Sequence, residues 1–577
     1  MNGLPPPGDP RRAQLTQGED VVDPVTWAGS LPVRTGIAPR VRIGRSRWFN
    51  LLWLLPIGFV GLITAIAVAK ELRQLDSVQA FIERSPGTVA EGPEGIPTWV
   101  GWQHFLNLFM MIFIIRSGWQ ILADHPRLYW TRHSTPGKEW FRTQREVPED
   151  PLWTAKQESL TLPRHVGLPG IRHSIGLARW WHLGVDVLWL VNGAVFSVMI
   201  FATGHWRRLV PMGWDHVPNA ASVALQYASL DWPTEDGWVG YNSLQLVAYF
   251  ITVFVAAPGA LVTGLGMSPA LSTRFRRISS VLSVQAARSL HFLVMAWFVL
   301  FIVMHVTFVA TTGVQENLNH IYAGRDDGSW LGVWIFLAST VLVVGAWLAA
   351  TPSTLRRPRT VQRVGFALIG PVQKLFGHID SKPGQYTGDD ISPYFWHNGK
   401  YPETDEYWAL HDGGFADYRL WIDGVVANPI ELSLAELRAL PHHEQITQHF
   451  CIQGWSGVAK WGGVSMRSIL ELVQPKPEAK WVIFYSFAVG PEGGIYYDAH
   501  PIEQMSYELT MLAYEMNGEN VSFGHGAPLR LRNEVQFGFK HVKWIKGIEF
   551  LEHFSEVGGG LGGYNNDHEF FGYSQSV

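Results

Sequence analysis

Residues 449–461 read His-Phe-Cys-Ile-Gln-Gly-Trp-Ser-Gly-Val-Ala-Lys-Trp and contain Cys451, the only cysteine among 577 residues. A lone cysteine excludes an internal disulfide and a CxxC metal knuckle. The thiol can then be a small buried apolar group, a nucleophile, or a single thiolate ligand to a soft metal ion. The segments that follow in the chain decide among these roles.

Three such segments follow in order: Met516-Asn-Gly-Glu519, His525-Gly-Ala-Pro-Leu-Arg-Leu531 and Gly538-Phe-Lys-His-Val-Lys-Trp544. With the stretch around Cys451, they resemble the sulfite oxidase superfamily of molybdenum–pterin enzymes. The resemblance implies a molybdopterin-binding oxidoreductase domain in which Cys451 is the single protein ligand of molybdenum. Soft thiolate sulfur suits that ion.

The same resemblance implies the other residues of the site. Tyr497 resembles the family's active-site tyrosine, although Tyr496 could fill that role equally well. In sulfite oxidases an arginine stands near the position of His397 and an arginine-rich stretch follows the cysteine. Here 452–455 read Ile-Gln-Gly-Trp, so sulfite is disfavoured as the substrate. The expected cofactor contacts are His397, Asn398, Asp498, His525, Arg530, Lys540, His541 and Lys543.

The first half of the chain has the composition of a membrane protein. Charged residues make up only 16% of the chain, which has 27 tryptophans, and its net charge of −4 gives no support for nucleic-acid binding. Six segments are long and apolar enough to span a bilayer. They lie near 48–69, 101–122, 180–203, 243–265, 289–311 and 330–350.

Basic residues predict the orientation of these segments. Lys and Arg are concentrated in 1–50, 123–179, 267–288 and 351–374 and are sparse in 71–99, 204–242 and 313–329. The positive-inside rule then puts both termini and the C-terminal domain on the cytoplasmic side of the cell (inner) membrane. We interpret the histidines of the loop 123–179 as ordinary loop residues.

Histidines within the segments predict two metal-binding positions. His291 and His305 lie fourteen residues apart, which puts them on one helix face about 21 Å apart. That spacing suits two stacked haems, because histidine is an axial haem ligand. At matching depth, His182 would pair with His291 and His104 with His305, with His205 as the alternative to His104.

This arrangement resembles the cytochrome b subunits of formate dehydrogenases and nickel hydrogenases, and the resemblance implies two haem b groups. The fold class expected is multidomain: an all-α six-helix transmembrane bundle followed by an α+β sulfite-oxidase-type domain. In that domain we expect strands at 418–422 and 481–487 and helices at 434–440 and 466–473. The expected units are a disordered tail 1–46, a dihaem cytochrome b domain 47–350, a linker 351–385 and a molybdopterin-binding domain 386–577.

These expectations describe a membrane-bound oxidoreductase. Two-electron chemistry, in the first instance oxygen-atom transfer on a small-molecule substrate, would be coupled through two haems to quinone or a redox partner protein, with membrane lipid around the helices. The alternative is a transmembrane cytochrome b or redox sensor whose molybdenum-type domain serves as a docking module. The presence of Cys451 favours the enzyme.

Overall fold

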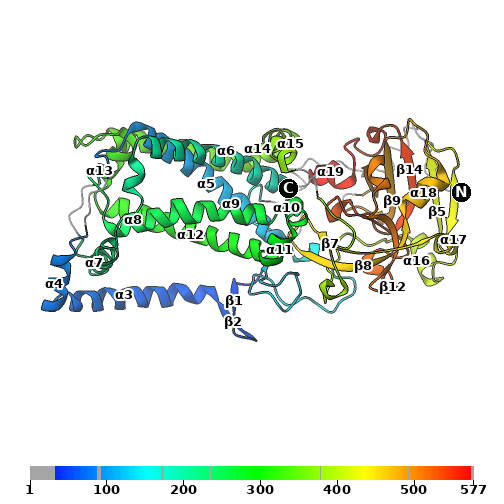
Figure 1. Cartoon of the computed structure of the whole chain (residues 1–577), viewed down its shortest axis with the longest axis horizontal. Helices are drawn as coiled ribbons and strands as arrows, with labels where there is room; N and C mark the ends of the chain where they lie inside the picture. Colours follow the sequence, from blue (N-terminus) through cyan, green and yellow to red (C-terminus); the bar gives the residue numbers. More distant parts are fainter. Residues whose placement is uncertain are drawn as a thin grey trace.

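The computed structural model describes residues 33–87, 92–170, 175–232, 237–376, 379–491 and 493–572. The molecule is elongated, with a bundle of long helices at one end and a sheet-rich domain at the other (Figure 1).

Within the described residues, six helical segments are long and apolar enough to cross a membrane, which indicates a multi-pass membrane protein. Each overlaps one of the six segments expected from the sequence, so that prediction is confirmed. They are α3 (Leu54–Leu72), α5 (Thr98–Asp124), α6 (Ile175–Ala202), the continuous run α8 (Ser243–Phe250), η4 (Ile251–Ala256) and α9 (Ala257–Gly266), α12 (Val284–Thr311) and α14 (Leu331–Arg356).

The fourth span changes its winding halfway along. Its middle section, η4, is a π-helix, and Pro258 follows it in the first turn of α9. Proline has no N–H to donate and its ring crowds the carbonyl one turn earlier, so the helix widens there.

Short elements lie at both ends of the bundle (Figure 1). Those at the end far from the sheets are α4 (Asp76–Arg84), η3 (His205–Arg208), α7 (His216–Ala228), α13 (Val314–Leu318) and η5 (Asn319–Ala323). Those at the near end are α10 (Pro269–Arg274) and α11 (Arg276–Val281).

Two expectations about the segments flanking the bundle are corrected. The predicted linker contains α15 (Pro358–Phe376), which packs along α6 because its apolar residues recur at helical spacing and bury Gly365 and Ile369. The predicted disordered tail is wrong for β1 (Arg40–Ile43), which pairs with β2 (Arg47–Asn50) and β4 (Phe141–Arg142). β3 (Arg127–Leu128) completes this small sheet.

The C-terminal domain is built on two sheets. The first has the strand order β10-β9-β14-β5-β6 and the second β12-β11-β8-β7, with β13 also pairing β11. The strands are β5 (Arg419–Gly424), β6 (Ile430–Ser433), β7 (His442–Phe450), β8 (Ser456–Ser465), β9 (Trp481–Val489), β10 (Ile495–Pro501), β11 (Thr510–Met516), β12 (Glu519–Asn520), β13 (Arg530–Asn533) and β14 (Ile545–Leu551).

Both sheets contribute to the main core. Buried side chains such as Ile422 and Phe484 of the first sheet meet Val464 and Leu512 of the second. The helices are α16 (Asp405–Asp412), α17 (Leu434–Ala439), α18 (Met466–Val473) and α19 (Tyr564–Glu569). Both helices and both strands expected from the sequence in this domain are present.

Candidate functional site

Cys451 stands at the start of a tight turn between β7 and β8. Its carbonyl accepts from the N–H of Gly454 at 2.9 Å, and its own N–H donates to the carbonyl of Trp455 at 3.0 Å. Gly454 has φ +104°, a conformation that glycine adopts far more readily than other residues. The turn therefore holds the thiol in one place.

The Cys451 thiol is buried among Phe395, Trp461 and other apolar side chains. Its Sγ lies 4.0 Å from Nδ2 of Asn398 and from Oε1 of Gln453. Burial raises the pKa of the thiol to about 12, so it keeps its proton at neutral pH unless a cation replaces that proton.

Two cations near this turn, the buried Arg530 and the partly buried Lys543, have no acidic partner among the described residues. Lys543 donates to the carbonyls of Asn398 and Gly524, and Arg530 donates to the carbonyl of His525 at 2.7 Å. Neither has a carboxylate at ion-pair distance in the part of the chain that the structure describes. Burial lowers the pKa of both groups well below the ordinary range. Charges removed from water are normally paired, so we expect an anion to bind beside these two side chains.

Histidines line the same region. The rings of His397 and His525 lie 5.4 Å apart, and His525 is oriented by the Ser522 hydroxyl at 2.8 Å and the Phe395 carbonyl at 3.1 Å. Burial lowers the pKa of His397 to about 4 and that of His525 to about 3. His541 donates to the carbonyl of Asn533 at 2.8 Å.

Several buried polar atoms here have no hydrogen-bond partner among the described residues. They are Nε2 of His397, Oδ1 of Asn398, Nε of Arg530 and Nδ1 of His541. Buried polar atoms are rarely left unpaired. The site thus combines unpaired donors and acceptors, a buried and a partly buried cation, and one buried thiol. This set fits an anionic pterin with a thiolate-bound metal ion.

The structure directs three of the expected site residues elsewhere. Lys540 forms a buried ion pair with Asp498 and also donates to the carbonyl of Ala499 at 2.7 Å. Tyr497 donates to Asp567 and to the carbonyl of Val557 at 3.1 Å, and it packs in an apolar cluster separate from that of Cys451. The structure therefore does not bring these three residues together with the thiol: β10 presents Tyr497 and Asp498 to other neighbours, and Lys540, which precedes β14, pairs with Asp498.

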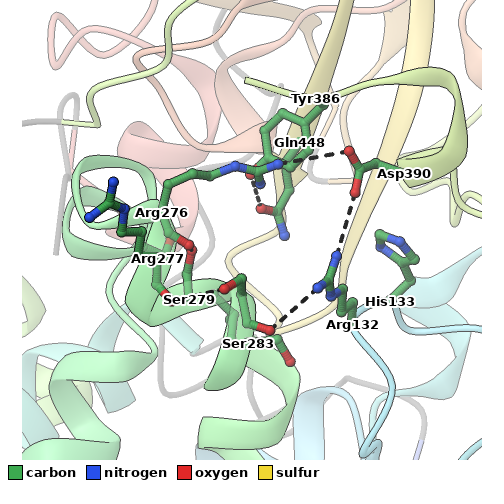
Figure 2. Close-up of a pocket in the computed structure, with 12 residues that line it drawn as sticks. Arg132, His133, Arg276, Arg277, Ser279, Ser283, Tyr386, Asp390 and Gln448 are labelled. Atoms are coloured by element: carbon green, nitrogen blue, oxygen red, sulfur yellow. Dashed lines mark hydrogen bonds and ion pairs between the residues drawn. The ribbon is translucent and has the colours of Figure 1, made fainter. Parts of the chain in front are cut away.

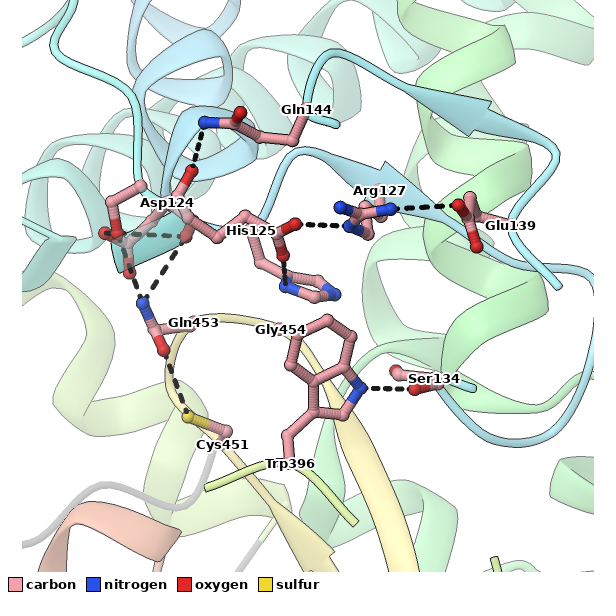
Figure 3. A network of polar contacts seen from close by, with 12 residues as sticks. Asp124, His125, Arg127, Ser134, Glu139, Gln144, Trp396, Cys451, Gln453 and Gly454 are labelled. Atoms are coloured by element: carbon pink, nitrogen blue, oxygen red, sulfur yellow. Dashed lines mark hydrogen bonds and ion pairs between the residues drawn. The ribbon is translucent and has the colours of Figure 1, made fainter. Parts of the chain in front are cut away.

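One wall of the site comes from the loop between α5 and α6, which sequence reasoning missed. His125 is fully buried, lies 3.1 Å from a carboxylate oxygen of Glu158 and packs edge-on against Trp396 at 5.0 Å (Figure 3). Ala155 donates its N–H to the carbonyl of His397 at 3.0 Å. Our interpretation of His125 as an ordinary loop residue is wrong. The length of the loop was the available signal, because long loops in compact proteins are usually functional.

The ends of two long helices form hydrogen bonds with the cysteine turn. From the end of α5, the carbonyl of Asp124 accepts a hydrogen bond from Gln453 at 3.4 Å (Figure 3). From the start of α12, Gln285 donates to the carbonyl of Gly454 at 2.9 Å and to the Ser456 hydroxyl at 3.0 Å. The turn is thus fixed to the helix bundle on two sides.

The same helices lead to a pair of histidines. The rings of His182 on α6 and His291 on α12 lie 6.3 Å apart. Nδ1 of His182 lies 3.0 Å from the hydroxyl of Ser117 on α5, and Nδ1 of His291 lies 2.9 Å from the hydroxyl of Thr263. These bonds engage Nδ1 of each ring, and Nε2 of His182 lies 3.6 Å from a carboxylate oxygen of Asp186.

A second pair lies toward the other end of the bundle. The rings of His104 on α5 and His305 on α12 lie 6.1 Å apart. His205 instead packs against Trp99 and is bonded to Thr203 at 2.9 Å. The structure thus brings His104, rather than His205, to His305.

Both ring spacings fit an iron between the two rings. Two metal–nitrogen bonds of about 2 Å, with about 1 Å from each nitrogen to its ring centre, put the centroids roughly 6 Å apart. Gly118 and Gly264 leave room beside the first pair, since a Cβ there would lie 3.3 Å from the ring of His182 and 3.8 Å from that of His291.

Comparison with known proteins identifies the C-terminal domain. Residues 409–557 match the model of the oxidoreductase molybdopterin binding domain family. The chain is also 32% identical to the uncharacterized oxidoreductase YuiH of Bacillus subtilis over 156 residues, which are 26% of this chain and 76% of that protein. The chain therefore belongs to the molybdopterin-binding oxidoreductases of the sulfite oxidase family, and it is an enzyme.

Two further relatives carry more specific names. Over 228 residues, 35% of this chain and 72% of the relative, the chain is 29% identical to the protein-methionine-sulfoxide reductase catalytic subunit MsrP of Gluconobacter oxydans. It is 32% identical to the putative protein-methionine-sulfoxide reductase subunit YedZ1 of Azospira oryzae over 133 residues, 23% of this chain and only 48% of that protein. Sulfane dehydrogenase SoxCD of Paracoccus pantotrophus is 25% identical, over 24% of this chain and 39% of that one, with a TM-score of 0.21.

Proposed function

We propose that this protein is a membrane-bound molybdenum–pterin oxidoreductase that exchanges electrons between the Cys451 site and two haems b in its own helix bundle. The observation that carries the proposal is the hydrogen bonding between the bundle helices and the cysteine turn. Gln285 on α12 bonds that turn, and His291 lies six residues further along the same helix. The two candidate redox sites therefore share one rigid support.

In this proposal Cys451 is the thiolate ligand of molybdenum, and Arg530, Lys543, His397 and His525 bind the pterin and its phosphate. Gln453 and Asn398, which hydrogen-bond each other beside the sulfur, orient the metal's surroundings. When bound, the group supplies two-electron oxygen-atom-transfer chemistry. The buried, aromatic lining of the site excludes bulk water from it.

The histidine pairs would be the one-electron carriers. His182 and His291, at the end of the bundle next to the sheets, would hold the haem nearer the molybdenum; His104 and His305 would hold the other. Beyond them we propose quinone or a redox partner protein as the electron donor. The concentration of Lys and Arg in alternate loops supports a cytoplasmic C-terminal domain and an inner-membrane location.

A sulfoxide is the substrate class that we propose. Two relatives are named for methionine sulfoxide reduction, and the chain lacks the arginine-rich stretch that favours sulfite. The reaction breaks the S–O bond: a sulfoxide, two electrons and two protons give a sulfide and water. Each haem supplies one of the two electrons.

Metal and haem analysis of the purified full-length protein tests the assignment. We expect about one molybdenum and two haems per chain in the wild type, and loss of substrate-driven haem oxidation in Cys451→Ser, because the thiolate is the only protein ligand to that ion. Molybdenum absent from folded wild-type protein that contains both haems would refute the enzyme proposal and favour a cytochrome with a docking domain.

A further inference from the structure

A cavity of about 270 Å³ lies where the sheet-rich domain meets the ends of the bundle helices (Figure 2). One side is formed by α11 and the start of α12, another by the loop that follows α5, and the third by β7 and the segment before α16. It lies apart from the cysteine site, since Gln448 of β7 lines it whereas the neighbouring His449 is buried against Trp455.

The cavity carries excess positive charge. Three of its lining residues are arginines, Arg132, Arg276 and Arg277, and Asp390 is its only acid. The Asp390 carboxylate forms two long ion pairs, at 3.6 Å with Arg132 and at 3.8 Å with Arg276. Arg277 has no ion-pair partner among the described residues. Because the Arg277 guanidinium points away from Asp390 (Figure 2), Arg132 and Arg276 against Asp390 give the cavity about one uncompensated positive charge.

One guanidinium group, that of Arg276, is held in position. The Cζ atom of Arg276 lies over the ring of Tyr386, 3.8 Å from its centre, and the Tyr386 hydroxyl donates to Gln448 at 2.5 Å. Ser283, which caps the start of α12, also lines the cavity, so the positive end of that helix dipole faces it. A fixed arginine beside a helix N-terminus, with a second arginine nearby, forms a site for an oxyanion.

The position of α11 indicates where such an anion would come from. The helix connects the end of one membrane span to the start of the next, so it lies at the level of the membrane surface. Phe275, Ile278 and Val281 recur every three residues and are 49%, 64% and 87% exposed. On the opposite face Arg276 lines the cavity. Apolar side chains beside a basic pocket are typical of a lipid-binding surface.

We propose that this cavity binds the phosphate headgroup of an anionic glycerophospholipid, with the acyl chains lying along the exposed apolar face of α11. Free phosphate offers the same oxyanion, but it would leave that apolar face uncovered. The bound lipid would bridge the bundle, through Arg276 and Ser283, and the sheet-rich domain, through Gln448 of β7. The inference depends on the membrane-spanning helices and not on the redox chemistry.

Native mass spectrometry of the full-length protein, released from nanodiscs of phosphatidylcholine with a minor fraction of phosphatidylglycerol, tests this proposal. We expect the wild type to retain phosphatidylglycerol preferentially. Arg276→Gln should reduce retention by about tenfold, because it removes a charge-assisted bond to the phosphate. Arg132→Gln should have a similar effect from a different element, and Asp390→Asn should increase retention by removing the acid.

Arg274→Gln is the matched control, because Arg274 is exposed on the same membrane side and does not line the cavity. An equal loss in Arg274→Gln and Arg276→Gln would mean general attraction to a charged membrane and would overturn the proposal. Displacement of the lipid by inorganic phosphate at matched concentration would assign the site to a soluble anion and would also overturn it.

Discussion

The Nε2 atom of Gln285 donates a hydrogen bond to the carbonyl of Gly454, and this contact joins a bundle helix to the cysteine turn. Gly454 comes three residues after Cys451, and Gln285 comes six residues before His291. At 1.5 Å per residue, Gln285 and His291 are about 9 Å apart along α12. The predicted molybdenum ligand and a predicted haem ligand are thus separated by little more than one hydrogen bond and two turns of helix.

Replacing Gln285 by leucine should weaken this connection without removing either metal. The change leaves the carbonyl of Gly454 and the hydroxyl of Ser456 without their donor, which costs about 1–3 kcal/mol for buried groups. We expect a lower unfolding temperature and slower electron transfer between the two centres, with molybdenum and haem contents unchanged. Gln315→Leu, which removes a similar bond to the carbonyl of Gly328, is the control that should leave electron transfer intact.

Each histidine pair should hold one haem. His182→Ala or His291→Ala should remove the haem next to the sheets, and His104→Ala or His305→Ala the other, because each iron would lose one of two axial ligands. Absorption spectroscopy of the purified variants measures haem per chain. His205→Ala should retain both haems; loss of a haem in that variant would show that the outer ligand has been assigned to the wrong histidine.

Two lysines that sequence reasoning treated alike should behave differently. Lys543→Gln should reduce bound pterin with little change in folding, since Lys543 bonds only carbonyls in the structure. Lys540→Met should instead destabilise the domain by about 3–5 kcal/mol, because it leaves Asp498 buried without its partner. Pterin release and thermal unfolding measure the two effects.

The second lysine has an internal control. In Lys540→Met with Asp498→Asn, no buried charge is left unpaired, so most of the lost stability should return. If the double variant is as unstable as the single one, and if the single variant loses pterin while remaining folded, Lys540 is a cofactor contact after all.

The sequence predicted the parts of this protein that depend on local pattern. Apolar segments of sufficient length identified the six long helices. The helical spacing of the histidines and their expected depth in the membrane paired His182 with His291 and His104 with His305, and the structure brings these pairs together. Motif order identified the family. Contacts between residues far apart in the sequence could not be predicted. Strand β10 turns Tyr497 toward Asp567, and the loop after α5 brings His125 to Trp396.

Mild acid should destabilise the junction around His125. Burial lowers the pKa of His125 below 6.5; burial alone would raise that of Glu158, but the bonds from His125 and Arg127 hold it below its usual value. In both cases the unfolded chain binds a proton at a higher pH than the folded chain does. The stability from His125 is therefore present above pH 6.5 and is lost as the pH falls below it; that from Glu158 is lost below about 4.5.

Thermal unfolding of the full-length protein at pH 7.5 and pH 5 checks this. We expect a lower unfolding temperature at pH 5, and a smaller difference between the two in His125→Gln. The dependence should not vanish, because His397 and His525 also have lowered pKa values. His553→Gln, on an exposed side chain, is the control. An unchanged pH dependence in His125→Gln would contradict the assignment.

The most direct test of one continuous electron path is to follow the haem absorbance of the reduced full-length protein, without oxygen, after methionine sulfoxide is added. In the fully reduced wild type two equivalents of sulfoxide should oxidise both haems, because each S–O bond broken consumes two electrons and the proposed molybdenum site and haems together hold four. In Cys451→Ser, with both haems present, the spectrum should not change. Haem oxidation at the wild-type rate in Cys451→Ser would contradict the account, since electrons would then leave the haems without passing through the cysteine site.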